Sequence, residues 1–302
     1  MNKPLVLVTG ASGFIGTQLI SYLLEQNYAV VGLSRQKNKV AQHPSMQWIQ
    51  DFDQLKTDQI DYVINLAGES IGQGRWTDQR KQKLIQSRVE TTEHLYRYLQ
   101  QRNITPKRII SGSAVGFYGI DPTEQWSLSC DEHAPSQAIF MSELCQKWEA
   151  VTAQYPKQNT KTIRLGVVFG RKGGILPQML MPIKLNLVKK IGKGLQPCVW
   201  VHIQDVIHAI EFLMLNETQQ NVFNVVAPEK LNQKGFAGIA SVALKKKPCL
   251  NLPAMLFKVM LGEQSQLILN GQYVQPKALQ DAGFVFQFPT LKQALNDLIV
   301  NA

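Results

Sequence analysis

The chain has few cysteines and no long apolar run, and both absences exclude classes of protein. Its four cysteines are scattered through 302 residues, with no C-x-x-C pair and no histidine cluster nearby. This spacing predicts free thiols in a reducing cytoplasm rather than disulfides or a metal site. No run of about 18 apolar residues is present, so we expect no transmembrane helix. No signal-peptide pattern precedes the first apolar segment, which also favours a cytoplasmic protein. The four cysteines are Cys130, Cys145, Cys198 and Cys249.

The composition is that of an ordinary globular protein, with 44% hydrophobic and 18% charged residues. A net charge of +10 raises the question of nucleic-acid or membrane partners. The basic residues are spread along the chain, however, and are dense only at 35–39, 189–190 and 245–247. We interpret this charge as a solvated surface that also attracts a phosphorylated cofactor. We therefore expect a small-molecule substrate, no nucleic acid, no membrane, and a monomer or homodimer.

Strands and helices alternate through the first half of the chain, which predicts an α/β fold with a doubly wound parallel sheet of the Rossmann type. We expect six strands here, at 5–8, 29–34, 46–50, 62–66, 108–111 and 162–168. We expect helices at about 78–101 and 139–154.

After Gly170 the alternation of strands and helices stops, because glycines and prolines divide the chain into loops and short helices. We expect the chain to return to the first layer at 199–215 and 222–226, and to end in a helix started by Pro289-Thr290. We assign 1–170, with returning segments at about 199–227, to a dinucleotide-binding domain. We assign 171–198 and 228–302 to a smaller, mixed α/β C-terminal unit on the substrate side.

A glycine-rich turn between the first strand and the next apolar helix is the most informative motif. Gly10, Gly13 and Gly16 are spaced G-x-x-G-x-x-G. The first glycine permits a sharp turn, the second the approach of a diphosphate, and the third close packing of helix on sheet. The N–H groups of the first helical turn then hold the phosphate charge. The motif predicts a dinucleotide site.

The end of the second strand reads Leu33-Ser34-Arg35, with no carboxylate to accept hydrogen bonds from a ribose 2′-hydroxyl. A serine hydroxyl and a guanidinium suit a 2′-phosphate, which a carboxylate would repel. The sequence therefore favours NADP(H) over NAD(H), although Arg35 as a plain surface charge is the alternative.

These motifs make the chain resemble the extended short-chain dehydrogenase/reductase superfamily, and within it the NAD-dependent epimerase/dehydratase group. The resemblance rests on the Thr9–Gly16 motif, on the segments 65–68, 111–119 and 164–170, and on 200–206. Asp51-Phe52 resembles the acidic and apolar pair placed against adenine. The segments 68–71, 74–77, 87–88, 145–149 and 265–288 are similar to the bacterial YfcH-like epimerase-family proteins, whose C-terminal domain has no known function. The glycine motif and the resemblance together predict cofactor contacts at Thr9, Gly10, Ser12, Gly13, Phe14, Ile15, Gly16, Ser34, Arg35, Asp51, Phe52, Leu66, Ala67, Gly68, Glu69 and Ser111.

Catalysis in the superfamily rests on a serine and on a tyrosine four residues before a lysine, both on one helix face. Ser113 matches the serine position. The helix that should carry the pair has neither group in either register, Phe140/Leu144 or Met141/Cys145. A Tyr-x-x-x-Lys string exists at Tyr273 and Lys277, but Pro276 lies within it and we interpret it as a coincidence.

We therefore predict that catalysis runs through Ser113 and Tyr118, with packing beneath the loop as the alternative for Tyr118. We place Glu69, Arg75 and Trp76 on the substrate side, with structural roles as the alternative for Glu69 and Trp76. We expect a core thiol at Cys145 and a structural junction at His202 and Asp205. Two functions stay open: an NADP(H)-dependent oxidoreductase or epimerase-like enzyme on a small polar or sugar-like substrate, and a non-catalytic NADP(H)-binding protein with a redox-sensing or regulatory role.

Overall fold

In the computed structural model, which describes residues 3–36, 39–171 and 173–300, seven parallel strands form the central sheet. Their spatial order is β3-β2-β1-β4-β5-β7-β12. The strands are apolar and buried because helices cover both faces of the sheet. The strands are β1 (Leu5–Thr9), β2 (Ala29–Leu33), β3 (Met46–Ile49), β4 (Tyr62–Asn65), β5 (Arg108–Ala114), β7 (Thr160–Leu165) and β12 (Val222–Val225).

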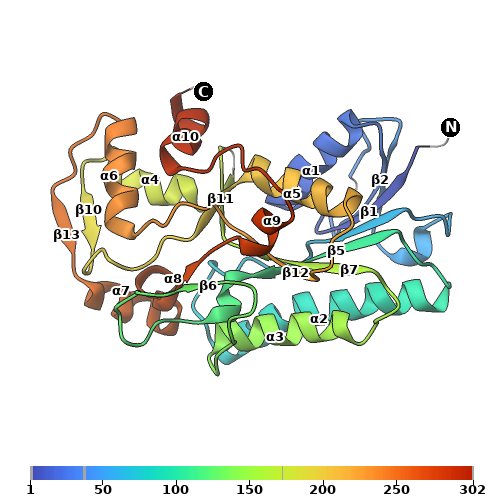
Figure 1. Cartoon of the computed structure of the whole chain (residues 1–302), viewed down its shortest axis with the longest axis horizontal. Helices are drawn as coiled ribbons and strands as arrows, with labels where there is room; N and C mark the ends of the chain where they lie inside the picture. Colours follow the sequence, from blue (N-terminus) through green and yellow to red (C-terminus); the bar gives the residue numbers. More distant parts are fainter. Residues whose placement is uncertain (1–2, 37–38, 172, 301–302) are drawn as a thin grey trace.

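Two pairs of helices form the outer layers, on opposite sides of the sheet (Figure 1). Helices α1 (Phe14–Glu25) and α5 (Ile203–Leu215) pack together on one side, and α2 (Asp78–Gln101) and α3 (Phe140–Ala153) on the other. Leu19, Ile20 and Leu23 of α1 recur at helical spacing and are buried against the sheet. The predicted doubly wound parallel sheet is confirmed.

The prediction of one continuous strand at 162–168 is wrong, because the structure divides this run into two strands at Gly166. Strand β7 stays in the central sheet, whereas β8 (Val167–Gly170) pairs with β11 (Trp200–His202) and with β9 (Gly173–Gly174). A Cβ on Gly166 would lie 3.0 Å from Val226 Cγ1 and 3.2 Å from the Val199 oxygen. The close approach of two returning segments therefore requires a glycine at the point where the strand leaves the sheet.

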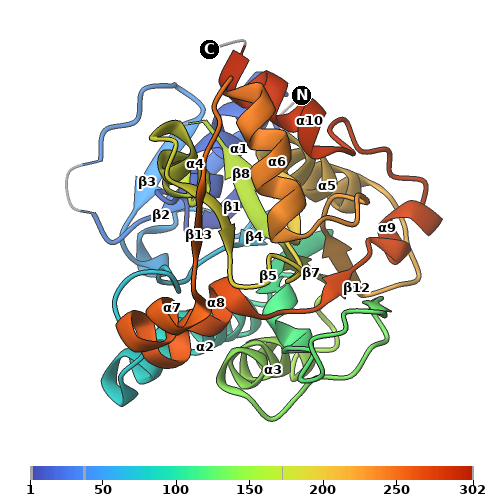
Figure 2. The same ribbon diagram turned by 90° about the vertical axis from the view of Figure 1, so that its left-hand side faces the viewer.

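The remaining elements build a smaller body beside the sheet, seen end-on in Figure 2. Its strands β10 (Val188–Ile191) and β13 (Leu250–Leu252) pair in parallel. Strand β14 (Tyr273–Val274) pairs with β6 (Ser129–Cys130), which brings the C-terminal segment against the loop that precedes α3. The helices of this part are α4 (Leu176–Lys184), α6 (Gln233–Ala243), α7 (Ala254–Leu261), α8 (Gln266–Leu269), α9 (Lys277–Asp281) and α10 (Leu291–Leu295). Short helical turns are η1 (Phe52–Gln54), η2 (Val115–Tyr118), η3 (Gly262–Ser265) and η4 (Asn296–Val300).

Candidate functional site

The glycine turn between β1 and α1 lies where the strand order reverses, between β1 and β4. Gly10 has φ +66°, and a Cβ there would lie 2.5 Å from the Leu66 oxygen. A Cβ on Gly16 would lie 2.3 Å from the Gly10 oxygen, so this glycine permits the helix to approach the turn. A Cβ on Gly13 would meet only the Gly10 oxygen within 4 Å, at 3.1 Å. The space in front of Gly13 is therefore open.

The first turn of α1 carries no acidic residue, and its N-cap, Gly13, provides no side chain to accept a hydrogen bond. The Gly13 N–H bonds the Gly10 oxygen at 2.9 Å, and the Thr17 N–H bonds the Gly13 oxygen at 3.0 Å. The N–H groups at the start of a helix otherwise lack intrahelical partners. Together with the helix dipole, they suit the charge of a diphosphate. The residues present therefore fit the phosphate end of a dinucleotide.

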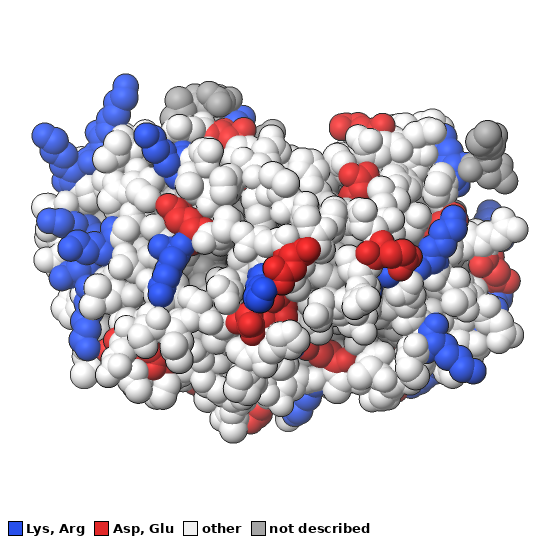
Figure 3. Space-filling model, viewed as in Figure 1, with Lys and Arg blue, Asp and Glu red and all other residues white. Residues whose placement is uncertain are grey.

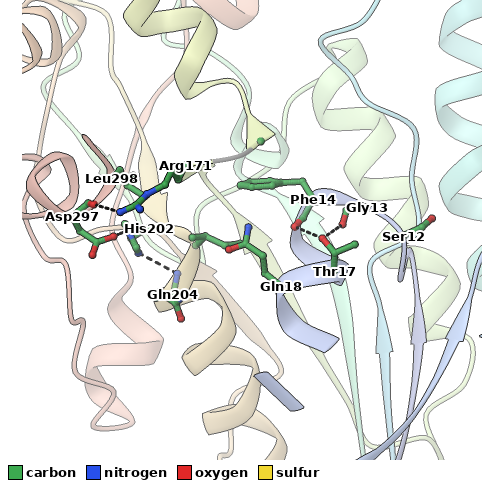
Figure 4. Close-up of a pocket in the computed structure, with 12 residues that line it drawn as sticks. Ser12, Gly13, Phe14, Thr17, Gln18, Arg171, His202, Gln204, Asp297 and Leu298 are labelled. Atoms are coloured by element: carbon green, nitrogen blue, oxygen red, sulfur yellow. Dashed lines mark hydrogen bonds and ion pairs between the residues drawn. The ribbon is translucent and has the colours of Figure 1, made fainter. Parts of the chain in front are cut away.

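The Phe14 ring turns away from this opening and fixes the β8–β9 hairpin. A Cβ on Gly173 would lie 2.4 Å from the ring, and one on Gly170 would lie 2.6 Å from it. A cavity of about 590 Å³ lies between the N-terminal ends of α1 and α5 (Figure 4). Ser12, Gly13 and Phe14 of the glycine turn line it, together with Arg171, His202 and Asp297. The glycine turn therefore opens into this cavity, and Phe14 forms part of its wall.

At the end of β2, the Ser34 hydroxyl donates to Ser12 Oγ at 3.1 Å. Arg35 extends into solvent, with 86% of its side chain exposed, and its Nη1 lies 3.3 Å from Glu69 Oε1. The Arg80 guanidinium pairs with the same carboxylate at 2.7 Å, and the Lys83 ammonium lies 3.6 Å from it. Three cations thus surround one carboxylate beside two serine hydroxyls, which leaves a local excess of positive charge.

Glu69 was predicted to contact cofactor and substrate, with bonds to neighbouring backbone as the alternative, and its carboxylate is engaged by these three cations. The hydrogen bond from Arg80 holds the pKa of the Glu69 carboxyl below its ordinary value. The backbone is fixed as well, because the Glu69 N–H donates to Ser87 and the Glu69 oxygen accepts from Arg88 at 2.8 Å. Glu69 therefore positions Arg35 and Arg80. Sequence reasoning missed Arg80 and Lys83, whose i, i+3 spacing on one helix face is a weak signal at best.

Three other predicted cofactor residues have side chains committed to the protein interior. The Thr9 hydroxyl donates to Asn65 Oδ1 at 2.7 Å, and Asn65 Nδ2 donates to Ser111 Oγ at 3.2 Å and to Thr92 Oγ1 at 2.9 Å. Phe52 is 1% exposed, and its ring centroid lies 5.2 Å from those of Tyr98 and His94. The Phe52 ring is therefore enclosed in the core, and the placement of the Asp51-Phe52 pair against adenine stays a prediction.

Asp51 caps the short turn that contains Phe52, since its Oδ1 accepts from the Asp53 N–H at 3.1 Å. Asp51 is exposed shortly after the end of β3, where a cofactor could reach its side chain. Leu66, Ala67 and Gly68 form the loop that follows β4, and Gly68 packs under the Arg88 side chain. A Cβ on Gly68 would lie 3.1 Å from Arg88 Cζ. Ile15 packs its side chain against the core, so it offers the site its backbone only.

A buried polar network connects the two residues predicted to be catalytic. The Ser113 hydroxyl donates to Glu149 Oε1 at 2.6 Å. Arg164 pairs with both oxygens of the same carboxylate, with Nε at 2.9 Å from Oε1 and Nη2 at 2.7 Å from Oε2. Arg164 Nη1 also donates to the Tyr118 hydroxyl at 2.9 Å, and Tyr118 donates to Asn224 Oδ1 at 2.7 Å. The Tyr118 hydroxyl thus donates one hydrogen bond and accepts one, both within the protein.

Tyr118 is fully buried, and burial raises its pKa to about 12 although Arg164 opposes the shift. The Tyr118 side chain has no exposed surface, and its hydroxyl lies between two protein partners. The geometry therefore corrects the prediction of an accessible acid at Tyr118 and favours packing, because Arg164 and Asn224 hold the hydroxyl from two different strands. Ser113 is 2% exposed, and its hydroxyl faces a carboxylate.

Residues 6–226 match the NAD dependent epimerase/dehydratase family. The chain belongs to this family. Residues 252–298 match a domain of unknown function, DUF1731. An epimerase family protein of Staphylococcus aureus is 32% identical over 300 residues, covering 97% of this chain and 98% of that protein.

Solved structures agree with this assignment. The human epimerase family protein SDR39U1, crystallised with NADPH, has a TM-score of 0.87 and 30% identity over 99% of this chain and 100% of its own. A nucleoside-diphosphate sugar epimerase from Corynebacterium glutamicum has a TM-score of 0.76 and 24% identity, over 98% of this chain and 58% of its own. The second likeness shows the fold alone.

In this epimerase-family chain, the helix expected to carry the tyrosine and lysine is α3. Met141 and Cys145 are buried there at that spacing. Burial raises the pKa of the Cys145 thiol to about 11, and its Sγ donates to the Ala114 oxygen at 3.6 Å. A buried thiol with a raised pKa fits the predicted core residue rather than a nucleophile. All four cysteines are free thiols.

The other residues singled out from the sequence have identifiable partners. The Trp76 indole donates to the Ile71 oxygen at 3.1 Å and packs edge-on against Phe140, which fits the structural alternative. Arg75 is exposed beside Gly262 of the C-terminal segment. Tyr273 lies beneath Lys230, and Lys277 pairs with Asp281 at 2.7 Å, so the two residues of the Tyr-x-x-x-Lys string have separate partners.

His202 and Asp205 form the junction between β11 and α5. His202 Nδ1 accepts from the Gln204 N–H at 3.1 Å, and the Asp205 carboxylate accepts from the Gln287 and Phe288 N–H groups at 2.7 and 3.1 Å. Desolvation lowers the pKa of His202 to about 4, against the opposing charge of Asp297. Asp205 therefore ties the C-terminal segment to the sheet. Among the described residues, no group of three metal-binding side chains occurs, and no helix is long and apolar enough to span a bilayer.

Proposed function

We propose that this epimerase-family protein is an NADP(H)-dependent oxidoreductase or epimerase-like enzyme that acts on a small polar or sugar-like substrate. The observation that carries the cofactor choice is the cluster of Arg35, Arg80 and Lys83 around Glu69, beside Ser12 and Ser34. An excess of cations with adjacent hydroxyls matches the charge and hydrogen bonding of a 2′-phosphate. The NADPH in the crystals of human SDR39U1 supports the same choice.

The residues assigned to the cofactor have separate tasks. The first turn of α1 would hold the diphosphate, with Gly13 leaving room for it. Arg35, with Ser34 behind it, would hold the 2′-phosphate, while Glu69 keeps Arg35 near the end of β2. The bound nicotinamide supplies hydride transfer.

The proton step would use Ser113 with Glu149. The Ser113 hydroxyl lies at the end of β5, on the edge where the strands of this sheet meet their ligand. Its proton already points to the Glu149 carboxylate at 2.6 Å, and Arg164 keeps that carboxylate oriented. A substrate oxygen that bonds Ser113 would thereby gain a path for proton transfer to a carboxylate. This assignment replaces Tyr118, whose hydroxyl is enclosed.

The non-catalytic NADP(H)-binding protein is the second candidate, and the buried Met141 and Cys145 on α3 favour it. Titrations of NADPH and NADH, followed by a screen of carbonyl and sugar-nucleotide compounds for NADPH oxidation, distinguish the two. Arg35→Ala should weaken NADPH binding by about 1.5–3 kcal/mol and leave NADH binding unchanged. Arg97→Ala, an exposed arginine of α2 paired with Glu93, is the matched control. An unchanged NADPH/NADH ratio in Arg35→Ala would refute the phosphate site.

For the proton step, Ser113→Ala should lower turnover by about 10²–10⁴-fold with cofactor affinity unchanged. The variant leaves the pair between Glu149 and Arg164 intact, so a loss of turnover would not come from a broken ion pair. Tyr118→Phe is the comparison variant. If its turnover falls more than that of Ser113→Ala at equal stability, the acid is Tyr118 after all. Cofactor binding with no turnover across a broad panel would support the non-catalytic candidate.

A further inference from the structure

The net charge of the protein is concentrated in two segments at one end of the molecule. Residues 175–198 and 230–261 together hold ten lysines and neither an aspartate nor a glutamate. The whole chain has 32 Lys and Arg and 22 Asp and Glu, so the remainder holds 22 of each. The net charge of +10 therefore equals the charge of these two segments. The ten are Lys184, Lys189, Lys190, Lys193, Lys230, Lys234, Lys245, Lys246, Lys247 and Lys258.

These lysines lie on the smaller body, and most of them are open to solvent. Nine are exposed, and Lys190 is half-buried. Lys193 pairs with Glu124 at 2.8 Å; for the other nine, the described part of the chain provides no acidic partner within 4 Å. Figure 3 shows blue side chains gathered at the left-hand end, over α6, β10 and β13. We call this end, made by residues 175–198 and 230–261, the lysine face.

The lysine face also exposes apolar side chains on α7. None of the eight residues of this helix is buried. Met255, Leu256, Val259 and Met260 are 67%, 45%, 69% and 61% exposed, and their spacing places them on one side of the helix. Lys258 lies among them in the sequence. These four apolar residues therefore present much of their surface to solvent.

A second apolar group adjoins the strands. Leu185 and Leu187 follow α4 and are 59% and 45% exposed, and Leu250 of β13 is 48% exposed. The Leu250 N–H donates to the Leu187 oxygen at 2.8 Å, and the Lys247 N–H donates to Asn186 Oδ1 at 2.8 Å. These bonds place exposed leucines beside the Lys245–Lys247 run. Figure 2 looks onto this end, where β13, α6 and α7 face the viewer.

From this arrangement we propose that the lysine face docks the protein onto an anionic lipid bilayer, with the apolar side of α7 at the level of the headgroups. Lysines attract the anionic surface, and methionine, leucine and valine insert between headgroups without needing a directional partner. This revises the expectation that no membrane is contacted. A second copy of the chain is a poor occupant, because two faces of ten lysines would repel.

Nucleic acid is also a poor match for the lysine face. The two segments contain no arginine, the residue best suited to bidentate phosphate contacts. Their two aromatic residues offer no exposed ring for stacking on bases, since Phe236 is buried and Phe257 is half-buried. A lipid surface requires neither group.

The test is sedimentation of the full-length protein with vesicles. Vesicles of phosphatidylcholine alone are compared with vesicles in which about a third of the lipid is phosphatidylglycerol. We expect binding to the second kind only, and loss of binding at high salt. Each lysine near an anionic surface strengthens binding about fivefold, so the loss of three lysines alone weakens binding about a hundredfold. The triple variant Lys245→Glu/Lys246→Glu/Lys247→Glu also adds three negative charges, so it should bind at least about a hundredfold more weakly. Met255→Ser/Val259→Ser should weaken binding at every salt concentration.

The matched control is Lys56→Glu/Lys147→Glu/Lys157→Glu, which changes three exposed lysines outside the lysine face. An equal loss in this control would overturn the proposal, because attraction would then come from net charge alone. Binding to neither kind of vesicle, or to both equally, would also overturn it. If vesicles are not bound, two further results would point to another occupant and overturn the proposal. One is a dimer that the variant Met255→Ser/Val259→Ser dissociates, and the other is binding of duplex DNA or of an acidic protein.

Discussion

Replacing Gly13 by valine should separate cofactor binding from folding. Gly13 has φ −78° and ψ 177°, an extended conformation that valine adopts readily. The added Cβ would meet the Gly10 oxygen at 3.1 Å, a contact that a shift of a few tenths of an ångström relieves. We therefore expect Gly13→Val to lower the free energy of unfolding by about 1 kcal/mol, the cost of a poor N-cap residue.

The effect on cofactor binding should be larger. The two methyl groups of valine would fill the opening in front of the first turn of α1, where the diphosphate would contact the backbone N–H groups. Each charge-assisted hydrogen bond contributes about 1.5–3 kcal/mol. Losing one such bond weakens NADPH binding by about 10-fold to 150-fold, and losing two abolishes binding at usual concentrations.

Calorimetric titration with NADPH and thermal unfolding followed by circular dichroism measure the two effects on the same samples. Gly16→Val is the contrasting variant, because its Cβ would lie 2.3 Å from the Gly10 oxygen and should unfold the domain. Gly238→Val, where an added Cβ meets no atom within 4 Å, controls for the substitution itself. If Gly13→Val is folded and binds NADPH with an unchanged Kd, the diphosphate lies elsewhere. If Gly13→Val fails to fold, Gly13→Ala repeats the test with a smaller side chain.

Three further variants test the interior. Tyr118→Phe leaves the buried Asn224 Oδ1 without its donor and removes one acceptor of Arg164 Nη1, so unfolding in urea should show a loss of about 1–3 kcal/mol with NADPH affinity unchanged. Glu149→Gln breaks the buried pair with Arg164 and should cost about 3–5 kcal/mol in the same assay, whereas Glu143→Gln on the exposed side of α3 should be neutral. The pKa of His202 is lowered to about 4 in the folded protein, so the unfolded chain takes up this proton first as the pH falls below 6.5. The free energy of unfolding should therefore decrease between pH 6.5 and 4, by at most about 3 kcal/mol. His202→Asn should flatten that part of the curve of stability against pH. If the variant and the wild-type protein give the same curve, the assignment to His202 is wrong.

The central sheet and its helices were predictable because local patterns specify them. The run Leu5–Thr9 is apolar at every interior position, as a strand covered on both faces must be. The predicted helix 78–101 has the observed bounds, since Thr77 caps it and its buried positions recur at helical spacing. The glycine turn was predictable for the same reason: each glycine acts on atoms only a few residues away, apart from the contact of Gly10 with Leu66.

The division of the run 162–168 was not predictable, because nothing in that run itself marks a change of sheet. Gly166 must be small on account of Val226 and Val199, which approach it from later in the sequence. The lysine face is a similar case. Its lysines are thinly spread along the chain, and the two segments come together through the pairing of β10 with β13 and the packing of α6 against α4 and β10.

The sequence by itself determined the parallel sheet, the dinucleotide turn and the absence of a carboxylate after β2, since these depend on neighbouring residues and on backbone conformation. Only the tertiary structure decided what the polar side chains do. Tyr118 is enclosed by Arg164 and Asn224, which lie 46 and 106 positions away. Ser113 meets Glu149 across 36 positions, and Glu69 meets Arg35 across 34. Burial and hydrogen bonding set the role of such groups, and both depend on which strands and helices the fold brings together.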